Sequence, residues 1–435
     1  MSDITAVVAR QVFDSRGRPT VEVDVTTSSG HVGRAAVPSG ASTGTSEAWE
    51  LRDGDPEHYA GLGVTSAVAH VHDEIAPALT GHPVSDQRGI DSEMLQLDGT
   101  PQLSRLGANA ILGVSLAVCR ASALTAEMPL HRRIAELAGV TTPSMPMPMV
   151  NILSGGLHAR SGMDVQDFLM IPASARDTNE ALAMVGAVRT AATEVMQGRG
   201  LSTLLADEGG LSPGLRTSEA ALELMVESFV AAGLQPGRDA VIAVDVAATT
   251  LWDDAQGAYR LPREDVTCTA RELIERYVRW IDEFPVISIE DPLHEEDWEN
   301  WPKVTEAIGN RCRIIGDDLF TTNSSRLRRG ISEESANGIL VKVNQNGTLT
   351  GTLDVIEDAH RAGFAPVVSA RSGETEDSFI SDLAVGTAAG QIKIGSVRCS
   401  DRLAKYNQLV RISEDSSIGF AGMSAVTVGD PVTTP

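Results

Sequence analysis

The chain is poor in the features that mark several classes of protein. Its four cysteines, Cys119, Cys268, Cys312 and Cys399, are scattered over 435 residues without CxxC or zinc-finger spacing. This usage is typical of reduced structural thiols rather than of a disulfide framework or a zinc module. No apolar run approaches the roughly 20 residues that a membrane-spanning helix needs, and Arg and acidic residues interrupt the N-terminal segment. These absences predict a cytoplasmic protein without a membrane span.

Basic residues are also scarce relative to acidic ones. The chain has 35 Lys and Arg against 59 Asp and Glu, a formal net charge of -24. Nucleic acid and anionic membrane surfaces would be repelled by this charge, so we expect neither as a partner. A small anionic substrate would need a local positive site.

The length of the chain predicts two domains, because 435 residues exceed what one hydrophobic core usually organises. Residues 4–37 alternate apolar and polar positions with turns at SRGRP and SSG, which indicates a three-stranded meander. Helical patterning follows from 65 to about 137, so residues 1–138 are predicted to be an α+β domain. The Pro- and Met-rich stretch 141–149 is the predicted boundary.

Residues 139–435 are predicted to form a βα barrel. From Val286 to Lys393, short apolar runs end again and again in a charged residue or a Ser/Arg cluster. These ends are roughly 20 to 30 residues apart, which is the size of a βα unit. In such barrels the C-terminal ends of the strands carry the chemistry.

Three carboxylates end successive predicted strands: Asp245 in VIAVDVA, Glu290 in VISIEDP and Asp317 in RIIGDD. Each alone could be a helix N-cap or a loop residue. Together at one end of adjacent strands, they would repel one another strongly unless a cation bound them. An all-oxygen ligand set favours a hard cation, most simply Mg²⁺.

Two lysines, Lys342 and Lys393, lie in otherwise apolar strands. Beside a bound metal each lowers the proton affinity of the other, so one could act as a base. The structural alternative is that both lysines only bridge to the carboxylates. Arg371 and Ser372 follow the next strand and suit a phosphoryl group or a carboxylate.

Other candidate residues lie in loops and are weaker signals. In LLADEGG two glycines allow a tight turn that aims Glu208 into a cavity. GGLHARSGMDVQDF contributes His158, Gln166 and Asp167, although a lone His is more often structural than catalytic. The small, polar stretch SGASTGTSEAWELRDGD around Ser42 is typical of a linker. A metal clamp, a lysine base and an opposing acid suit proton removal α to a carboxylate and loss of a β-hydroxyl.

The chain resembles the enolase family along nearly its whole length. The similarity is carried by DSRGRPTVEV (14–23), VPSGASTG (37–44), LGANAILGVSLAV, DEGG, SIEDP, GDDLFTTN, LVKVNQ, SGETED, GTAAGQIKIGS and SDRLAKYNQLVRI. The rival racemase and cycloisomerase branch typically carries a K-x-K motif, which this sequence lacks. The resemblance implies an enolase-type barrel with an irregular start, an N-terminal capping domain, two Mg²⁺ ions, a small phosphorylated acid as substrate and a homo-oligomer.

By position, the resemblance assigns a role to most of the candidate residues. It implies Asp245, Glu290 and Asp317 as the first Mg²⁺ site, and Ser42, in a mobile loop (38–46), as a ligand of a second Mg²⁺. Lys342 would be the base and Glu208 the acid that helps the hydroxyl leave. The resemblance also implies Lys393 as a carboxylate-binding residue, Arg371 and Ser372 as phosphoryl-binding residues, and His158 and Gln166 as further contacts to the substrate.

Two substitutions depart from the family within this predicted site. Ala370 stands where the family has His, and Asp167 stands where it has Glu. Three hypotheses follow: a housekeeping enolase that has drifted, a non-catalytic binding protein, or a dehydratase with an enlarged substrate. The third is favoured because loss of the imidazole opens space beside Arg371 for an extra carboxylate, with which Arg160 could pair. The carboxyphosphonoenolpyruvate synthases of phosphonate antibiotic pathways are enzymes of this kind.

Overall fold

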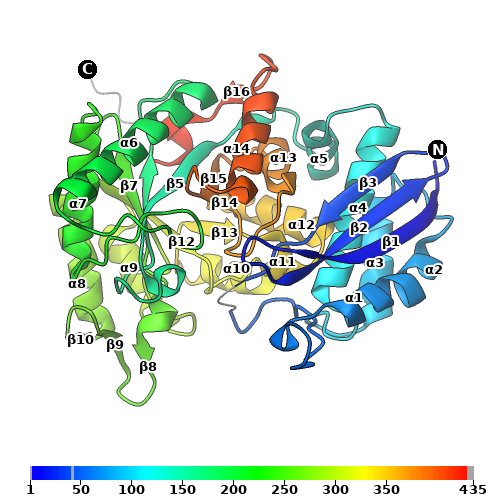
Figure 1. Ribbon diagram of the computed structural model, residues 1–435, viewed down its shortest axis with the longest axis horizontal. Helices are drawn as coiled ribbons and strands as arrows, with labels where there is room; N and C mark the ends of the chain where they lie inside the picture. The colour runs from blue at the N-terminus through cyan, green and yellow to red at the C-terminus, as the bar shows by residue number, and fades with distance from the viewer. Residues whose placement is uncertain (1, 41–43, 429–435) are drawn as a thin grey trace.

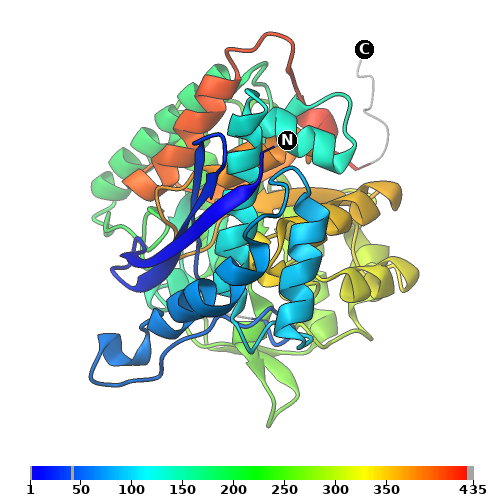
Figure 2. The same cartoon turned by 90° about the vertical axis from the view of Figure 1, so that its right-hand side faces the viewer.

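The computed structural model describes residues 2–40 and 44–428. An N-terminal sheet with its helices lies beside a larger barrel (Figure 1). Turning the molecule brings the N-terminal part to the front, where its sheet and helices cover one side of the barrel (Figure 2). The predicted fold class, a βα barrel with an α+β N-terminal part, is confirmed.

The N-terminal sheet is an antiparallel meander of β1 (Ile4–Phe13), β2 (Pro19–Thr27) and β3 (Val32–Ala36). Helix α4 (Ala108–Thr125) packs closely against β2 and β3. A Cβ atom added at Gly33 would lie 2.2 Å from the carbonyl oxygen of Ala117, so the approach requires glycine. The remaining helices of this part are η1 (Tyr59–Gly61), α1 (Thr65–His70), η2 (Val71–Ile75), α2 (Ala76–Leu79), α3 (Gln87–Asp98) and α5 (Leu130–Ala138).

Helix α4 is apolar on nearly all sides. Among the residues that the structure describes, it is the one helix whose length and composition would allow it to cross a membrane, yet 83% of its residues are buried inside the protein. Burial against the sheet explains this composition, because a helix that is enclosed by other elements needs no polar face.

Eight strands of the described chain close into a barrel in the order β11-β12-β13-β14-β15-β5-β6-β7. Their bounds are β5 (Met147–Ser154), β6 (Asp167–Ile171), β7 (Val241–Asp245), β11 (Val286–Glu290), β12 (Arg313–Gly316), β13 (Gly338–Val341), β14 (Ala365–Ser369) and β15 (Gln391–Gly395). The surrounding helices are α6 (Thr178–Gly198), α7 (Ser218–Ala231), α8 (Ala270–Glu283), α9 (Trp301–Ile308), α10 (Ser324–Ser332), α12 (Leu349–Arg361), α13 (Phe379–Gly386) and α14 (Ser400–Ile412).

Shorter elements precede, connect or follow the barrel strands in the chain. They are β4 (Ser144–Met145), η3 (Gly156–Ala159), η4 (Ala248–Leu251), the strands β8 (Trp252–Asp253), β9 (Ala258–Leu261) and β10 (Val266–Cys268), α11 (Val343–Asn346), β16 (Gly419–Phe420) and η5 (Gly422–Ala425). The resemblance implied an irregular start of the barrel, and the chain indeed passes from β5 to β6 through η3 rather than through a full crossover helix.

Strand β6 runs antiparallel to both of its neighbours, whereas the other adjacent pairs of barrel strands are parallel. Asp167, the first residue of β6, is therefore paired with Asp245, the last residue of β7. The beginning of β6 thus lies at the end of the barrel where the parallel strands finish, and its side chains can join theirs.

The opposite end of the barrel is filled and closed. An apolar cluster inside the barrel includes Met147, Leu169, Leu340 and Val426, the last from the C-terminal segment. Arg313, the first residue of β12, donates hydrogen bonds to the carbonyls of Val426 (3.0 Å) and Thr427 (2.7 Å). Polar chemistry is therefore confined to the C-terminal ends of the parallel strands, as is general for this architecture.

Candidate active site

Five charged residues meet at the C-terminal end of the barrel; we call them the strand-end cluster. Asp245 and Glu290 are the last residues of β7 and β11, Asp317 and Lys342 directly follow β12 and β13, and Lys393 lies within β15. All but Lys342 are less than a tenth exposed. Adjacent parallel strands bring these side chains together, as the sequence pattern predicted.

Each lysine of the strand-end cluster is paired with carboxylates. The Nζ atom of Lys393 lies 2.8 Å from Oδ2 of Asp245 and 2.6 Å from Oε2 of Glu290. The Nζ atom of Lys342 contacts Oδ2 of Asp317. Burial lowers the pKa of both ammonium groups, but the neighbouring carboxylates outweigh it and raise the pKa above the ordinary lysine value.

The carboxylates of the strand-end cluster fit a divalent hard cation by their chemistry. Burial and the charge of Asp245 raise the pKa of Glu290 well above its ordinary value, although Lys393 opposes them. Burial also raises the pKa of Asp317, but Lys342 and the other nearby cations together outweigh burial, so the net shift is downward. A buried oxygen-only set whose charges repel one another is suited to Mg²⁺. Asp245, Glu290 and Asp317 would hold such an ion.

Asp317 also belongs to a second group of neighbouring carboxylates. Oxygens of Asp291, Asp317 and Asp318 lie within 4.8 Å of one another. The side chain of Asp291 accepts hydrogen bonds from the backbone N–H groups of Asp317 and Asp318, each at 2.8 Å. Burial and Asp317 together raise the pKa of Asp318 to about 7. Asp291 therefore fixes the turn that presents Asp317, a role that the sequence analysis did not foresee although SIEDP and GDD carry its residues.

Arg371, a predicted phosphoryl-binding residue, makes an ion pair that the sequence analysis missed. Its Nη1 atom lies 2.9 Å from Oε2 of Glu47, which comes from the N-terminal part, and 3.0 Å from Oδ1 of Asn344. Gln345 donates hydrogen bonds to Oδ1 of Asp317 (2.9 Å) and to Oε1 of Glu47 (3.3 Å). Glu47 lies within the stretch that is typical of a linker, so no local pattern singled it out.

Ser372 lies at the contact between the two parts of the molecule. Its hydroxyl accepts a hydrogen bond from Nη1 of Arg16 at 3.3 Å, and its carbonyl accepts one from Nη2 of Arg402 at 2.8 Å. Ser39 and Gly373 exchange backbone hydrogen bonds of 2.8 and 3.0 Å. The chain is thus attached to the barrel just before residue 41. The predicted metal ligand Ser42 lies outside the described residues.

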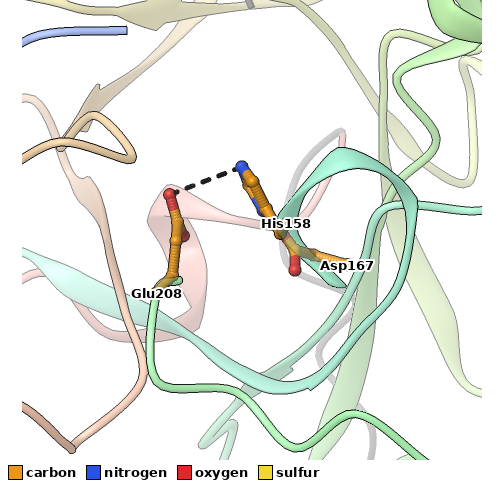
Figure 3. A group of neighbouring side chains, drawn as sticks. All are labelled: His158, Asp167 and Glu208. Atoms are coloured by element: carbon orange, nitrogen blue, oxygen red, sulfur yellow. Dashed lines mark hydrogen bonds and ion pairs between the residues drawn. The ribbon is translucent and has the colours of Figure 1, made fainter. Parts of the chain in front are cut away.

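Beside the strand-end cluster, His158, Asp167 and Glu208 form a second cluster, which we call the loop cluster (Figure 3). Nδ1 of His158 lies 2.9 Å from Oδ2 of Asp167, and Nε2 lies 3.8 Å from Oε1 of Glu208. Burial lowers the pKa of His158, but Asp167 and Glu208 outweigh it and raise this pKa to about 9. Asp167 is also held by Asn151 (2.5 Å) and Ser154 (2.8 Å), so its carboxylate is fixed behind the imidazole.

The glycines of DEGG position Glu208. Gly209 has a φ of +82°, a conformation that side chains rarely adopt, and a Cβ atom at Gly210 would lie 2.4 Å from Oγ of Ser154. The carbonyl of Glu208 accepts a hydrogen bond of 2.9 Å from the N–H of Ser396. Burial raises the pKa of Glu208, but His158 and the nearby cations together outweigh burial, so the net shift of this pKa is downward.

The two clusters face one cavity. It is lined by His158, Gln166, Glu208, Asp245, Ala247, Asp291, Asp317, Asp318, Lys342, Ser369, Ala370, Arg371, Ser372 and Lys393. Gln166 donates a hydrogen bond of 3.2 Å to Oδ2 of Asp245. Ala370 presents its methyl group between Ser369 and Arg371, and its N–H donates to the carbonyl of Lys393 at 2.9 Å. Most of the predicted site residues thus meet in one place.

Arg160 is not brought to this cavity. It ends η3 in the left-handed region, with a φ of +51°, and its side chain is exposed. Arg160 is not among the described residues that line the cavity. Its predicted pairing with an extra substrate carboxylate therefore has no support from the position of its side chain.

Comparison with known families gives matches on both parts of the chain. The family described as "Enolase, N-terminal domain" matches residues 4–134, and the family described as "Enolase, C-terminal TIM barrel domain" matches residues 142–428. The second match alone covers more than half of the chain and spans the strand-end cluster, the loop cluster and the cavity between them. The protein therefore belongs to the enolase family.

Proposed function

We propose that the protein is a Mg²⁺-dependent dehydratase that removes water from a 2-phosphoryl-glycerate-like acid. The observation that carries this proposal is that three buried carboxylates and two lysines meet in ion pairs at a cavity that Glu208 also lines. Family membership supports the same class of reaction, elimination of water by a carbon-oxygen lyase.

Each step is assigned to residues of this chain. Lys342 takes the proton α to the substrate carboxylate, and the electron pair of the broken C–H bond remains on the substrate. This pair then forms the C=C bond while the bond to the β-hydroxyl breaks. The proton that makes the leaving group water is delivered through Glu208, whose Oε1 lies 3.8 Å from Nε2 of the protonated His158. Once the ion pair with Asp317 is released, the positive charges of Arg371 and Lys393 favour loss of the Lys342 ammonium proton to solvent, which leaves the amine able to act as a base.

The remaining residues bind and orient the substrate. Lys393 holds its carboxylate, Arg371 and Ser372 hold its phosphoryl group, and Gln166 and His158 complete the contacts. Bound by Asp245, Glu290 and Asp317, with a second ion at Ser42, Mg²⁺ would stabilise the negative charge that develops on the substrate carboxylate.

For the substrate, we favour an enlarged molecule, with 2-phosphonoformylglycerate converted to carboxyphosphonoenolpyruvate. The support is that a methyl group at Ala370 lines the cavity directly beside Arg371, where the family has an imidazole. The housekeeping reaction, 2-phosphoglycerate to phosphoenolpyruvate, is the alternative. A non-catalytic role is disfavoured because decay would have removed the buried acids and lysines that remain.

We also propose the location, the partners and the domain organisation of the protein. The charge of -24 supports a small-molecule enzyme of the cytoplasm that binds neither nucleic acid nor membranes. Family membership supports a homo-oligomer, a dimer or a ring of dimers. We retain residues 1–138 and 139–435 as the two domains, with the predicted loop 38–46 in the first; residues 41–43 of this loop lie outside the described residues.

The test is a spectrophotometric assay of enol-ester formation with Mg²⁺ and each of the two substrates. The proposal expects turnover of the phosphonoformyl compound and slow or no turnover of 2-phosphoglycerate. Brisk turnover of 2-phosphoglycerate would overturn the enlarged substrate and leave the dehydratase. If neither compound reacts and calorimetry shows no Mg²⁺ binding, the non-catalytic alternative holds.

A further inference from the structure

A buried ion pair between the two parts of the molecule points to a residue that the reaction scheme leaves out. We propose that Glu47 is a positioning residue, which orients the guanidinium of Arg371 for the phosphoryl group and links it to Asp317. The role rests on the proposed function, since it concerns the same substrate.

Both carboxylate oxygens of Glu47 are engaged. Oε2 lies 2.9 Å from Nη1 of Arg371, and Oε1 lies 3.3 Å from Nη2. Oε1 also accepts the backbone N–H of Gly44 at 2.9 Å. Glu47 is 7% exposed and Arg371 is 4% exposed, so solvent screens this pair little. The pair therefore ties the Arg371 guanidinium to the chain that follows the Ser42 segment.

Gln345 extends the connection to the strand-end cluster. Its amide nitrogen donates to Oε1 of Glu47 and to Oδ1 of Asp317, and its amide oxygen accepts from Oγ1 of Thr322 at 2.7 Å. The hydroxyl of Thr322 holds the amide in this orientation. One amide thus separates Glu47 from a proposed metal ligand, and a chain of hydrogen bonds runs from Arg371 through Glu47 and Gln345 to Asp317.

The physical role follows from the geometry of arginine. A guanidinium is a planar fork whose value to a phosphoryl group depends on its orientation. A buried arginine that loses its carboxylate is left as an uncompensated charge and moves to find another acceptor. Glu47 therefore determines where the donors of Arg371 point, and its removal weakens substrate binding more than proton transfer at Lys342.

Glu295 provides a matched control because it contacts the same stretch of chain, at Thr45. Its carboxylate accepts the backbone N–H of Thr45 at 3.2 Å and the Thr45 hydroxyl at 3.4 Å, and it is 6% exposed. It holds the segment one residue beyond Gly44 but belongs to neither cluster of the site. A role in anchoring the loop alone would make Glu47 and Glu295 equivalent.

The experiment compares Glu47→Gln and Glu295→Gln in the full chain, with the substrate that the wild-type protein turns over. We expect Glu47→Gln to raise KM about tenfold while kcat changes less than about threefold, which is the effect of losing one charged hydrogen-bonding partner. The inhibition constant of inorganic phosphate should rise in parallel. Glu295→Gln should change both constants less than about twofold.

Three outcomes would overturn the role: an unchanged KM in Glu47→Gln, equal effects of the two substitutions, or a fall in kcat alone. Circular dichroism and the melting temperature check that each variant is folded. If Glu47→Gln does not fold, Glu47→Asp keeps the charge but shortens the reach, and a raised KM is again expected. If the wild type turns over neither substrate, the proposed function fails first. Calorimetry with inorganic phosphate then decides the role of Glu47 by the same tenfold criterion.

Discussion

The strand-end cluster and the loop cluster face the same cavity but are built differently. Asp245, Glu290 and Lys393 belong to strands, and Nζ of Lys393 lies within 2.8 Å of an oxygen of each carboxylate. In the loop cluster, His158 of η3 pairs with Asp167 of β6 at 2.9 Å, whereas Nε2 of His158 and Oε1 of Glu208 are 3.8 Å apart. The chain keeps the family residues throughout the strand-end cluster, whereas Asp167 departs from the family in the loop cluster. Asp167 is nevertheless held as firmly as the strand-end residues, by Asn151, Ser154 and His158, so Glu208 is the member of the loop cluster that stands apart.

The largest expected effect comes from the strand-end cluster. Lys342→Ala should lower kcat by about 10³- to 10⁴-fold with little change in KM, because the proton α to the carboxylate loses its acceptor. Steady-state kinetics with the preferred substrate measure this. Lys303→Ala is the control, because Lys303 pairs with Glu299 on the surface. If Lys342→Ala retains a tenth of the activity, Lys342 is not the base.

The next effect probes the loop cluster. Glu208→Gln should lower kcat by about 10²- to 10³-fold, because a neutral amide cannot protonate the departing hydroxyl. The effect is expected to be smaller than that of Lys342→Ala, since water can deliver a proton more easily than it can replace the amine. A greater loss at Glu208 than at Lys342 would reverse the proposed order of the two clusters.

A third substitution restores the family residue between the clusters. Ala370→His should lower activity on the phosphonoformyl substrate about tenfold, because the imidazole fills the space proposed for the extra carboxylate. The ratio of kcat/KM for the two substrates measures the change. Unchanged activity on the larger substrate would show that position 370 does not set specificity.

The smallest effect concerns the ionisation of the loop cluster. In the wild-type protein, the pKa of His158 is raised to about 9, burial being outweighed by the Asp167 and Glu208 carboxylates. Protonated His158 thus contributes stability that is fully present below the unfolded pKa of about 6.5 and is lost as pH rises through about 9. Asp167→Asn should lower this pKa, as measured by NMR titration of the His158 ring. An unchanged titration would mean that Asp167 does not hold the imidazole.

Much of the strand-end cluster could be predicted because its signals are local. An apolar run that ends in a charge identifies a strand and its functional end at once, and parallel neighbours place such ends together. The direction of β6 carries no such signal, since its five residues are buried in either orientation. Only the closed barrel shows that β6 runs against β5 and β7, which sets Asp167 opposite Asp245.

Long-range pairings were beyond the sequence for the same reason. Glu47 and Arg371 are 324 positions apart, and nothing around Glu47 marks it as other than a loop residue. Arg160 shows the converse: its place next to the His158 motif suggested a substrate contact, but the turn at η3 leaves its side chain exposed. Arg160 is therefore close to His158 in the sequence but does not line the cavity that His158 lines.

The sequence by itself indicated the family through its motifs. It also predicted the two-part architecture and the charged strand ends, because apolar periodicity and charged strand ends are short-range patterns. The tertiary structure decided which charges meet. It pairs Lys393 with Asp245 and Glu290, Lys342 with Asp317 and Glu47 with Arg371. Such pairings depend on how distant elements pack, and burial makes them decisive, because an ionised group inside the protein must find its partner there.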